Sequence, residues 1–236
     1  MEAYSEEMVL LNRDVNMFRK LRTSRLFELL QEVSIHHTEI LGAGRKVTLD
    51  RGLLWVVTLQ RAEINRIPEY DEKIVIETWP GKTMHVLFPR YYRMLDSHGE
   101  VLLSASALWT LVDCESRKVV SPDKYGVVIN GVSTGNEISD PMPTLKLETK
   151  QRRCFQVPFS YVDLNGHMNN THYFDLAEDL IPAAAEGRQL KTISTEYSAE
   201  ICMGETIDVC WGQDNNRYYL TGQKDKKCFR ISLEYE

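Results

Sequence analysis

The feature that most constrains this 236-residue chain is an internal repeat, because the same order of strand and helix patterns occurs twice. Each half has a strand-like segment, then polar residues, then apolar residues at helical spacing: 8–11 and 26–33 in the first half, 154–157 and 173–180 in the second. Placing Leu26 over Tyr173 gives an offset of 147 residues and also places Phe27 over Phe174. The chain is therefore expected to form two related units.

Each helical segment is followed by segments with the alternation of polar and apolar residues that is typical of strands. They are 53–59, 73–79, 90–95 and 101–112 in the first half, and 191–201, 206–211, 217–222 and 228–235 in the second. One helix cannot cover both faces of a sheet. We therefore expect an α+β fold in which two antiparallel sheets each wrap around one long helix and join side by side. The predicted units are residues 1–130 and 151–236, joined by a linker at 131–150 that is rich in Gly, Ser and Pro.

Composition and charge exclude several classes of protein. The net charge is −6, so general nucleic-acid binding is not expected. No apolar stretch approaches the roughly 18–20 residues that span a bilayer. The five cysteines are scattered without a C-x-x-C pair, and no phosphate-binding glycine loop is present, so we expect no disulfide framework, metal or cofactor. The acidic beginning lacks the pattern of a signal or transit peptide, which predicts a cytoplasmic protein.

The most informative motif lies just before the second apolar helical segment. Asp163, Asn165 and His167 place a carboxylate, an amide and an imidazole at alternate positions. We expect them at the start of the helix, where free backbone N–H groups and the helix dipole favour a developing oxyanion, and the N–H groups of Gly166 and His167 are the candidate donors. Asp163 or Asn165 alone fits a cap or a turn equally well, but neither structure needs an imidazole. The motif is a plausible place to hydrolyse an acyl bond.

Three groups of residues together resemble a known family. They are residues 55–61 with Pro68 and 76–79 in the first half, the motif at 163–170, and Glu196, Tyr197 and Glu200 followed by Gly204. This combination is similar to the acyl-acyl carrier protein thioesterases of plants and bacteria. The resemblance covers nearly the whole chain and implies a double hotdog fold.

The resemblance also implies an activity and a catalytic set. The activity is hydrolysis of the thioester of fatty acyl-acyl carrier protein, which releases a free fatty acid and terminates chain elongation. The catalytic network would be Asp163, Asn165, His167 and Glu200, with either His167 or Glu200 as the base. Family members often have a cysteine directly after the glutamate, whereas this chain has an isoleucine there and Cys202 next. We therefore expect Cys202 to be a small buried residue and not a nucleophile.

The repeat supplies an internal control. At the offset of 147, His167 corresponds to Lys20 and Asp163 to Asn16, so the first half lacks the imidazole and the carboxylate. We expect one active site per chain in the second unit, while the first contributes sheet, the wall of an acyl tunnel and docking charge. The candidates for docking an acidic carrier protein are Arg13, Arg19, Lys20, Arg22 and Arg25. An ordinary solvated face is the alternative for this basic segment.

Other functions remain open at this point. A thioesterase acting on acyl-coenzyme A would use the same chemistry with a different docking surface. A hotdog protein that binds acyl groups without hydrolysis is a second alternative, although a pure binder has no need of the complete polar set. A hotdog dehydratase is a weaker third. A homodimer through an exposed surface is also open.

Overall fold

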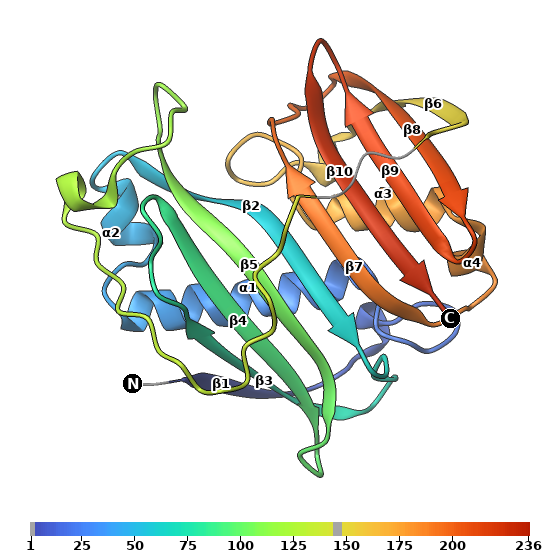
Figure 1. Cartoon of the computed structure of the whole chain (residues 1–236), viewed down its shortest axis with the longest axis horizontal. Helices are drawn as coiled ribbons and strands as arrows, with labels where there is room; N and C mark the ends of the chain where they lie inside the picture. The colour runs from blue at the N-terminus through green and yellow to red at the C-terminus, as the bar shows by residue number, and fades with distance from the viewer. Residues whose placement is uncertain (1–2, 144–147) are drawn as a thin grey trace.

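The computed structural model describes residues 3–143 and 148–236, which form helices on one face of a large sheet (Figure 1). The first half contains β1 (Tyr4–Val9), α1 (Thr23–Ile40), α2 (Arg45–Leu49), β2 (Leu53–Ile64), β3 (Lys73–Pro80), β4 (Leu87–Asp96) and β5 (Val101–Asp113). The second half contains β6 (Gln151–Gln156), α3 (His172–Leu180), α4 (Pro182–Ala185), β7 (Leu190–Tyr197), β8 (Thr206–Asp214), β9 (Arg217–Gln223) and β10 (Lys227–Tyr235). Short 3-10 helices lie at Asn12–Asp14, Pro122–Tyr125 and Phe159–Tyr161.

The order of the strands repeats in the same way as the sequence. In the described residues, one ten-stranded antiparallel sheet runs β1-β3-β4-β5-β2-β7-β10-β9-β8-β6. Counted from the outer edge, each half follows the same path, with β1, β3, β4, β5 and β2 matched by β6, β8, β9, β10 and β7. The halves join through β2 and β7, from Leu59 opposite Glu196 to Glu63 opposite Thr192. Two sheets joined side by side, as the sequence predicted, therefore form one continuous sheet.

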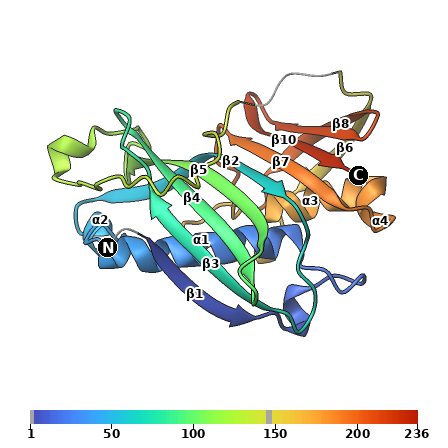
Figure 2. The same cartoon turned by 60° about the horizontal axis from the view of Figure 1, so that its bottom comes forward.

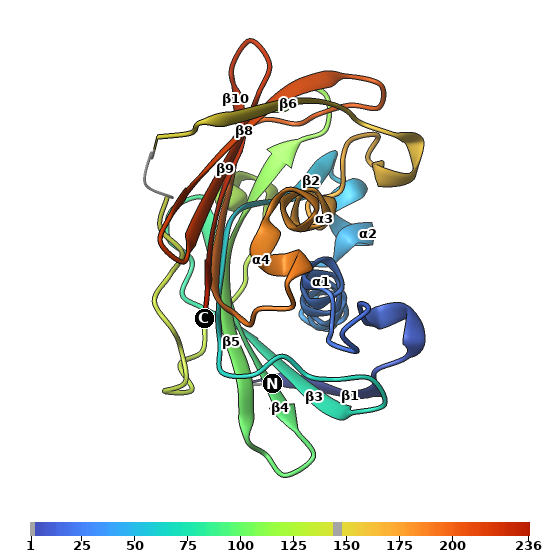
Figure 3. The same ribbon diagram turned by 90° about the vertical axis from the view of Figure 1, so that its right-hand side faces the viewer.

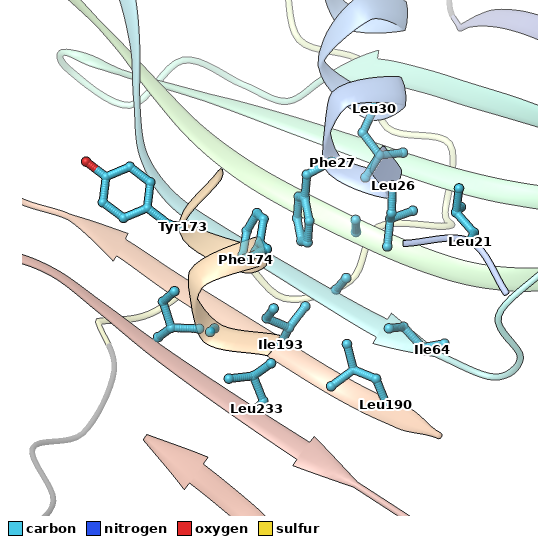
Figure 4. Close-up of a cluster of buried hydrophobic side chains, with 14 of the residues drawn as sticks. Leu21, Leu26, Phe27, Leu30, Ile64, Tyr173, Phe174, Leu190, Ile193 and Leu233 are labelled. Carbon is cyan, nitrogen blue, oxygen red and sulfur yellow. The ribbon is translucent and has the colours of Figure 1, made fainter. Parts of the chain in front are cut away.

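The helices pack against the same face of this sheet, α1 under the first half and α3 under the second (Figures 2 and 3). On α1, Leu26, Leu29, Leu30 and Val33 are buried because they recur at helical spacing. Phe27 of α1 stacks on Phe174 of α3, with ring centroids 4.2 Å apart (Figure 4). The two phenylalanines that the sequence repeat aligned thus meet at the junction between the halves.

The main helix of the second half, α3, is shorter than the long helix that the sequence predicted. It has nine residues and ends at Leu180, because Pro182 has no N–H to continue the hydrogen-bonding pattern and instead begins α4. No helix in the described part of the chain is long and apolar enough to cross a membrane.

The first part of the predicted linker lies along the sheet face opposite α1 (Figure 3). The indole of Trp79 donates to Glu137 at 3.0 Å, and the hydroxyl of Tyr91 donates to Asp140 at 2.7 Å. Residues 144–147 of the predicted linker lie outside the described residues. The limits of the two units, 1–130 and 151–236, stay a prediction.

Candidate active site

The Asp-Asn-His motif forms a tight turn between two short antiparallel contacts. Val162 pairs with Met168, and the backbone N–H of Asp163 donates to the carbonyl of His167 at 3.0 Å. The N–H of Gly166 closes the turn on the carbonyl of Asp163, also at 3.0 Å. Gly166 has a φ of +86°, a conformation that glycine adopts without a steric penalty. This turn holds the side chains of the motif together.

The first half contains the same turn at the offset that the sequence indicated. The N–H of Asn16 donates to the carbonyl of Lys20 at 2.8 Å, and Arg19, with a φ of +64°, closes the turn on Asn16 at 2.9 Å. The first half thus has Asn16, Phe18, Arg19 and Lys20 at the positions that correspond, in this order, to Asp163, Asn165, Gly166 and His167 of the second half. Four of the expected docking residues, Arg13, Arg19, Lys20 and Arg22, therefore lie on or beside a turn without the catalytic groups.

The expectation that the motif starts a helix is wrong. α3 begins at His172, five residues after His167. The side-chain oxygen of Asn169 accepts a hydrogen bond from the N–H of Thr171 at 2.9 Å, and the backbone carbonyl of Asn169 accepts one from the N–H of His172 at 3.1 Å. The N–H groups of Thr171 and His172, at the start of the helix, therefore already donate to acceptors in the same segment. The N–H of Gly166 is likewise committed to the turn, so an oxyanion role for it would require the turn to open. The oxyanion role of the His167 N–H stays a prediction.

The turn brings His167 against the loop that follows β7. Nε2 of His167 lies 3.2 Å from Oε1 of Glu200. Nδ1 of the same ring lies 4.0 Å from Oδ1 of Asp163, which is beyond hydrogen-bonding distance. The side chain of His167 is 15% exposed and that of Glu200 is 37% exposed. The carboxylate of Glu200 is therefore the member of this pair that water reaches more easily.

Asn165 is oriented from both sides. Its backbone N–H donates to Oδ1 of Asp163 at 2.7 Å, and its side-chain Nδ2 lies 3.3 Å from Oδ2 of the same carboxylate. Its Oδ1 lies 3.4 Å from Nη2 of Arg45, which belongs to the first half. Asp163 therefore acts as a support for Asn165. The structure brings together all four residues that the resemblance named.

Two arginines of the first half that the sequence did not single out also reach this site. Besides Arg45, Arg117 in the turn after β5 places Nη2 3.4 Å from Nε2 of His167 and Nη1 3.5 Å from Oε1 of Glu200. No pattern in the sequence marks either arginine, because the contacts arise only when the two halves pack together.

A cavity of about 140 Å³ lies between α1 and the first-half sheet and reaches the site at Asn165. Its wall is largely apolar and includes Ile35, Leu53, Trp55, Phe88 and Trp109. An elongated apolar group could enter this chamber while its polar end stayed beside Asn165. The sequence predicted an apolar space between a helix and a sheet, but its lining could not be identified.

The chamber also contains a buried positive charge. Arg90 is 4% exposed and donates to Nδ1 of His37 and to Oγ1 of Thr38, each at 2.8 Å. Burial, together with the neighbouring guanidinium, lowers the pKa of His37 to about 4. His37 is therefore neutral and acts as a hydrogen-bond acceptor for Arg90.

Cys202 is exposed, so the expectation that it is buried is wrong. The preceding residue, Ile201, takes the buried position instead. The backbone of Cys202 pairs with that of His167, and its N–H donates to Glu205 at 2.6 Å. Its backbone therefore supports the turn at 163–167.

The predicted docking segment lies at the far end of α1 from the turn at 163–167. It leads into Thr23, which bonds to Glu178 at the end of α3, whereas Asn165 meets Arg45 beyond the other end of α1. An 18-residue helix is about 27 Å long. Arg13, Arg19 and Arg22 are exposed, Lys20 is half-buried, and Arg25 is held by Asp14 at 2.7 Å and Glu28 at 3.0 Å.

Two family models match the sequence. The acyl-ACP thioesterase N-terminal domain matches residues 1–124, and the acyl-ACP thioesterase C-terminal domain matches residues 145–234.

Individual relatives are more distant. Acyl-[acyl-carrier-protein] hydrolase FATB3 of Cuphea viscosissima, a chloroplastic protein, is 26% identical over 209 residues, which cover 82% of this chain and 50% of the relative. Oleoyl-acyl carrier protein thioesterase 2 of Arabidopsis thaliana is 23% identical over 232 residues, with 87% and 62% covered. The chain spans about half the length of the Cuphea relatives that it matches.

Solved structures agree with the fold. The 12:0-ACP thioesterase from Umbellularia californica superposes with a TM-score of 0.83 at 17% identity and covers 100% of this chain and 98% of its own. An acyl-ACP thioesterase from Bacteroides thetaiotaomicron gives 0.80 at 20% identity, with the same coverage. The predicted double hotdog fold is confirmed, and the two matching models show that the chain belongs to the acyl-ACP thioesterase family.

Proposed function

We propose that this protein hydrolyses the thioester of a fatty acyl group bound to acyl carrier protein and releases a free fatty acid. The observation that supports this most directly is the position of Asn165. It borders the apolar chamber and belongs to the same turn as His167, which lies 3.2 Å from Glu200. An acyl chain in the chamber would therefore present its thioester to an amide, an imidazole and a carboxylate.

In the proposed reaction, Glu200 is the base and His167 orients it. The greater exposure of Glu200 supports this assignment, because the base must meet the attacking water. The water oxygen bonds to the carbonyl carbon while Glu200 takes the water proton. The C–S bond then breaks as the carbonyl re-forms, and the thiolate takes up the proton. Asn165, held by Asp163, would position the carbonyl or the water.

The test is a panel of acyl-acyl carrier protein and acyl-coenzyme A substrates of several chain lengths. Purified protein is scored for free fatty acid and free thiol, and Glu200→Gln is the control with strongly reduced activity. Release of both products from acyl-acyl carrier protein supports the proposal. Equal or faster release from acyl-coenzyme A would favour the alternative carrier. Binding of acyl chains without release of thiol would favour the non-catalytic alternative.

Three further proposals concern the cellular compartment, the docking of the carrier and the oligomeric state. The cytoplasm is the proposed compartment, supported by five free cysteines, which suit a reducing environment; fractionation of cells tests it. Docking of the carrier on the segment 13–25 and pairing of two chains into a homodimer are separate predictions. Light scattering of the purified protein tests the homodimer.

A further inference from the structure

Arg117 lies beside both residues proposed to activate water, although it comes from the other half of the molecule. Its Nη1 is 3.5 Å from Oε1 of Glu200, and its Nη2 is 3.4 Å from Nε2 of His167. The other groups facing His167 are Asp163 on its own turn and Cys202 on the paired segment. Arg117 is therefore the positive charge that faces both reactive side chains.

The backbone of Arg117 gives an independent reason to assign it a role. Its φ is +55°, in the left-handed region, where glycine and asparagine are favoured over other residues. The turn itself is held by others: the carboxylate of Asp113 accepts the N–H of Ser116 at 2.7 Å, and its carbonyl accepts the N–H of Arg117 at 3.0 Å. Glycine or asparagine would fit this position with less strain. Strained positions of this kind are frequent at functional sites. Arg19 has the same conformation outside the proposed site, so the assignment of Arg117 depends on its contacts with Glu200 and His167.

The charges in the site define what this side chain can do. A guanidinium beside Glu200 attracts the carboxylate and restricts where it can move relative to the adjacent imidazole. This attraction would hold the carboxylate where it can accept a proton from water. The contacts are long, as catalytic contacts often are before substrate binds. A second cation, Lys224, approaches only the backbone carbonyl of Glu200, at 3.4 Å, and its ammonium pairs with Glu205.

We propose that Arg117 is a positioning residue of the hydrolytic site, which holds Glu200 toward His167. This inference rests on the proposed function. It makes the site composite: the second half supplies the reacting groups, and a turn of the first half sets their geometry.

The kinetic test uses a small acyl thioester, so that carrier docking makes no contribution. Arg117→Asn removes the charge but suits the backbone, Arg117→Gly is a second such variant, and Arg117→Lys keeps the charge. Lys118→Asn is the matched control, because Lys118 is an exposed cation on the same turn. Each is measured alone, and Arg117→Asn is also combined with Glu200→Gln.

We expect Arg117→Asn to lower kcat by about tenfold or more while KM changes by less than about threefold. Arg117→Lys should recover part of this loss, and Lys118→Asn should stay within about twofold of the wild type. In the Glu200→Gln protein, the Arg117 substitution should add less than about twofold, because it acts through the carboxylate. The melting temperature of Arg117→Asn should be unchanged or higher, which separates positioning from a structural role.

Three kinetic results would overturn the inference: kcat within about twofold of wild type for Arg117→Asn and Arg117→Gly, a loss confined to KM, or a loss that adds in full to that of Glu200→Gln. NMR of the His167 ring gives a readout that needs no turnover. The signals of the ring should change position in Arg117→Asn, which removes the neighbouring guanidinium, and stay unchanged in Lys118→Asn; unchanged signals in both would refute the contact. If the wild type hydrolyses no thioester, the proposed function fails, and the NMR result still decides whether Arg117 acts on His167.

Discussion

Glu200, His167 and Asn165 are predicted to be indispensable individually. Replacing each with alanine should lower kcat by about 10²-fold or more, as the loss of a base or of a hydrogen-bonding group in the site does. Hydrolysis of an acyl thioester by the purified variants measures this. Asp179→Asn, an exposed change on α3, is the control and should leave the rate unchanged. Folded variants with near-normal rates would show that the site has been assigned wrongly.

Cys202 is predicted to be dispensable. Its thiol is exposed and makes no side-chain hydrogen bond within the described residues, whereas its backbone pairs with His167. Cys202→Ala should keep the turnover within about twofold of the wild type, because alanine preserves the backbone contacts. A loss as large as that of His167→Ala would instead indicate a nucleophilic thiol.

At the level of single residues, the sequence predicted a set of polar residues that the structure places together, but not their cationic partners. Asp163, Asn165 and His167 are close in sequence and carry groups that a turn does not require. Arg117 is 50 positions from His167, and Arg45 is 120 positions from Asn165. Contacts at such separations depend on how two halves pack, which a local pattern cannot reveal.

Strand β4 carries Arg90 into the chamber, and this residue is predicted to affect which acyl groups fit. Arg90→Met replaces a guanidinium with an apolar side chain, so the kcat/KM for longer acyl chains should rise relative to shorter ones. Each newly buried methylene contributes about 0.8 kcal/mol, or roughly fourfold. The melting temperature should fall, since His37 and Thr38 lose their donor.

The matched control for this change is Arg93→Met on the same strand. Arg93 lies on the opposite face of the sheet and pairs with Glu77 at 2.6 Å. It should leave the chain-length profile unaltered. An identical profile for Arg90→Met and the wild type would mean that Arg90 does not border the bound chain.

Helix α3 contains a carboxylate that links stability to pH. Burial raises the pKa of Glu178 to about 7, and its side chain accepts a hydrogen bond from Thr23 of α1. Because the folded protein holds this proton more tightly than the unfolded chain, the contribution of Glu178 to stability is complete below pH 4.5 and declines as pH rises toward 7.

Glu178→Gln should therefore raise the free energy of unfolding at pH 8 by roughly 1–2 kcal/mol, while the two proteins converge near pH 4. Urea titrations at several pH values measure the difference. A gap between the two proteins that does not change with pH would contradict the assignment.

Among elements, the strands were easier to predict than the start of the second helix. Alternation identified the strands of both halves, and the repeat fixed their equivalence. The start of α3 was missed because the turn at 163–167 and the side chain of Asn169 satisfy the backbone in a way that resembles a helix start in sequence. The proline that ends α3 was visible in the sequence, yet its effect on helix length was not predicted.

For the molecule as a whole, the predicted carrier surface can be tested by charge reversal. Arg19→Glu with Arg22→Glu should weaken turnover of acyl-acyl carrier protein and leave a small thioester unaffected, because only the carrier needs the basic surface. Initial rates at low and high salt measure this. Lys118→Glu, at the turn beside the catalytic groups, is the comparison. If it alone weakens carrier turnover, docking occurs beside the site and not at the far end of α1.

The seam between β2 and β7 separates two tasks that one active site must combine. On the proposed function, most of the pocket that admits the acyl group belongs to residues before the seam, whereas the groups that activate the attacking water belong to residues after it. Arg45 and Arg117 reach across from the first half, so the rate depends on how the two halves pack. A fragment that contains only one half would have either the acyl pocket or the residues that activate water. Neither fragment alone would hydrolyse a thioester.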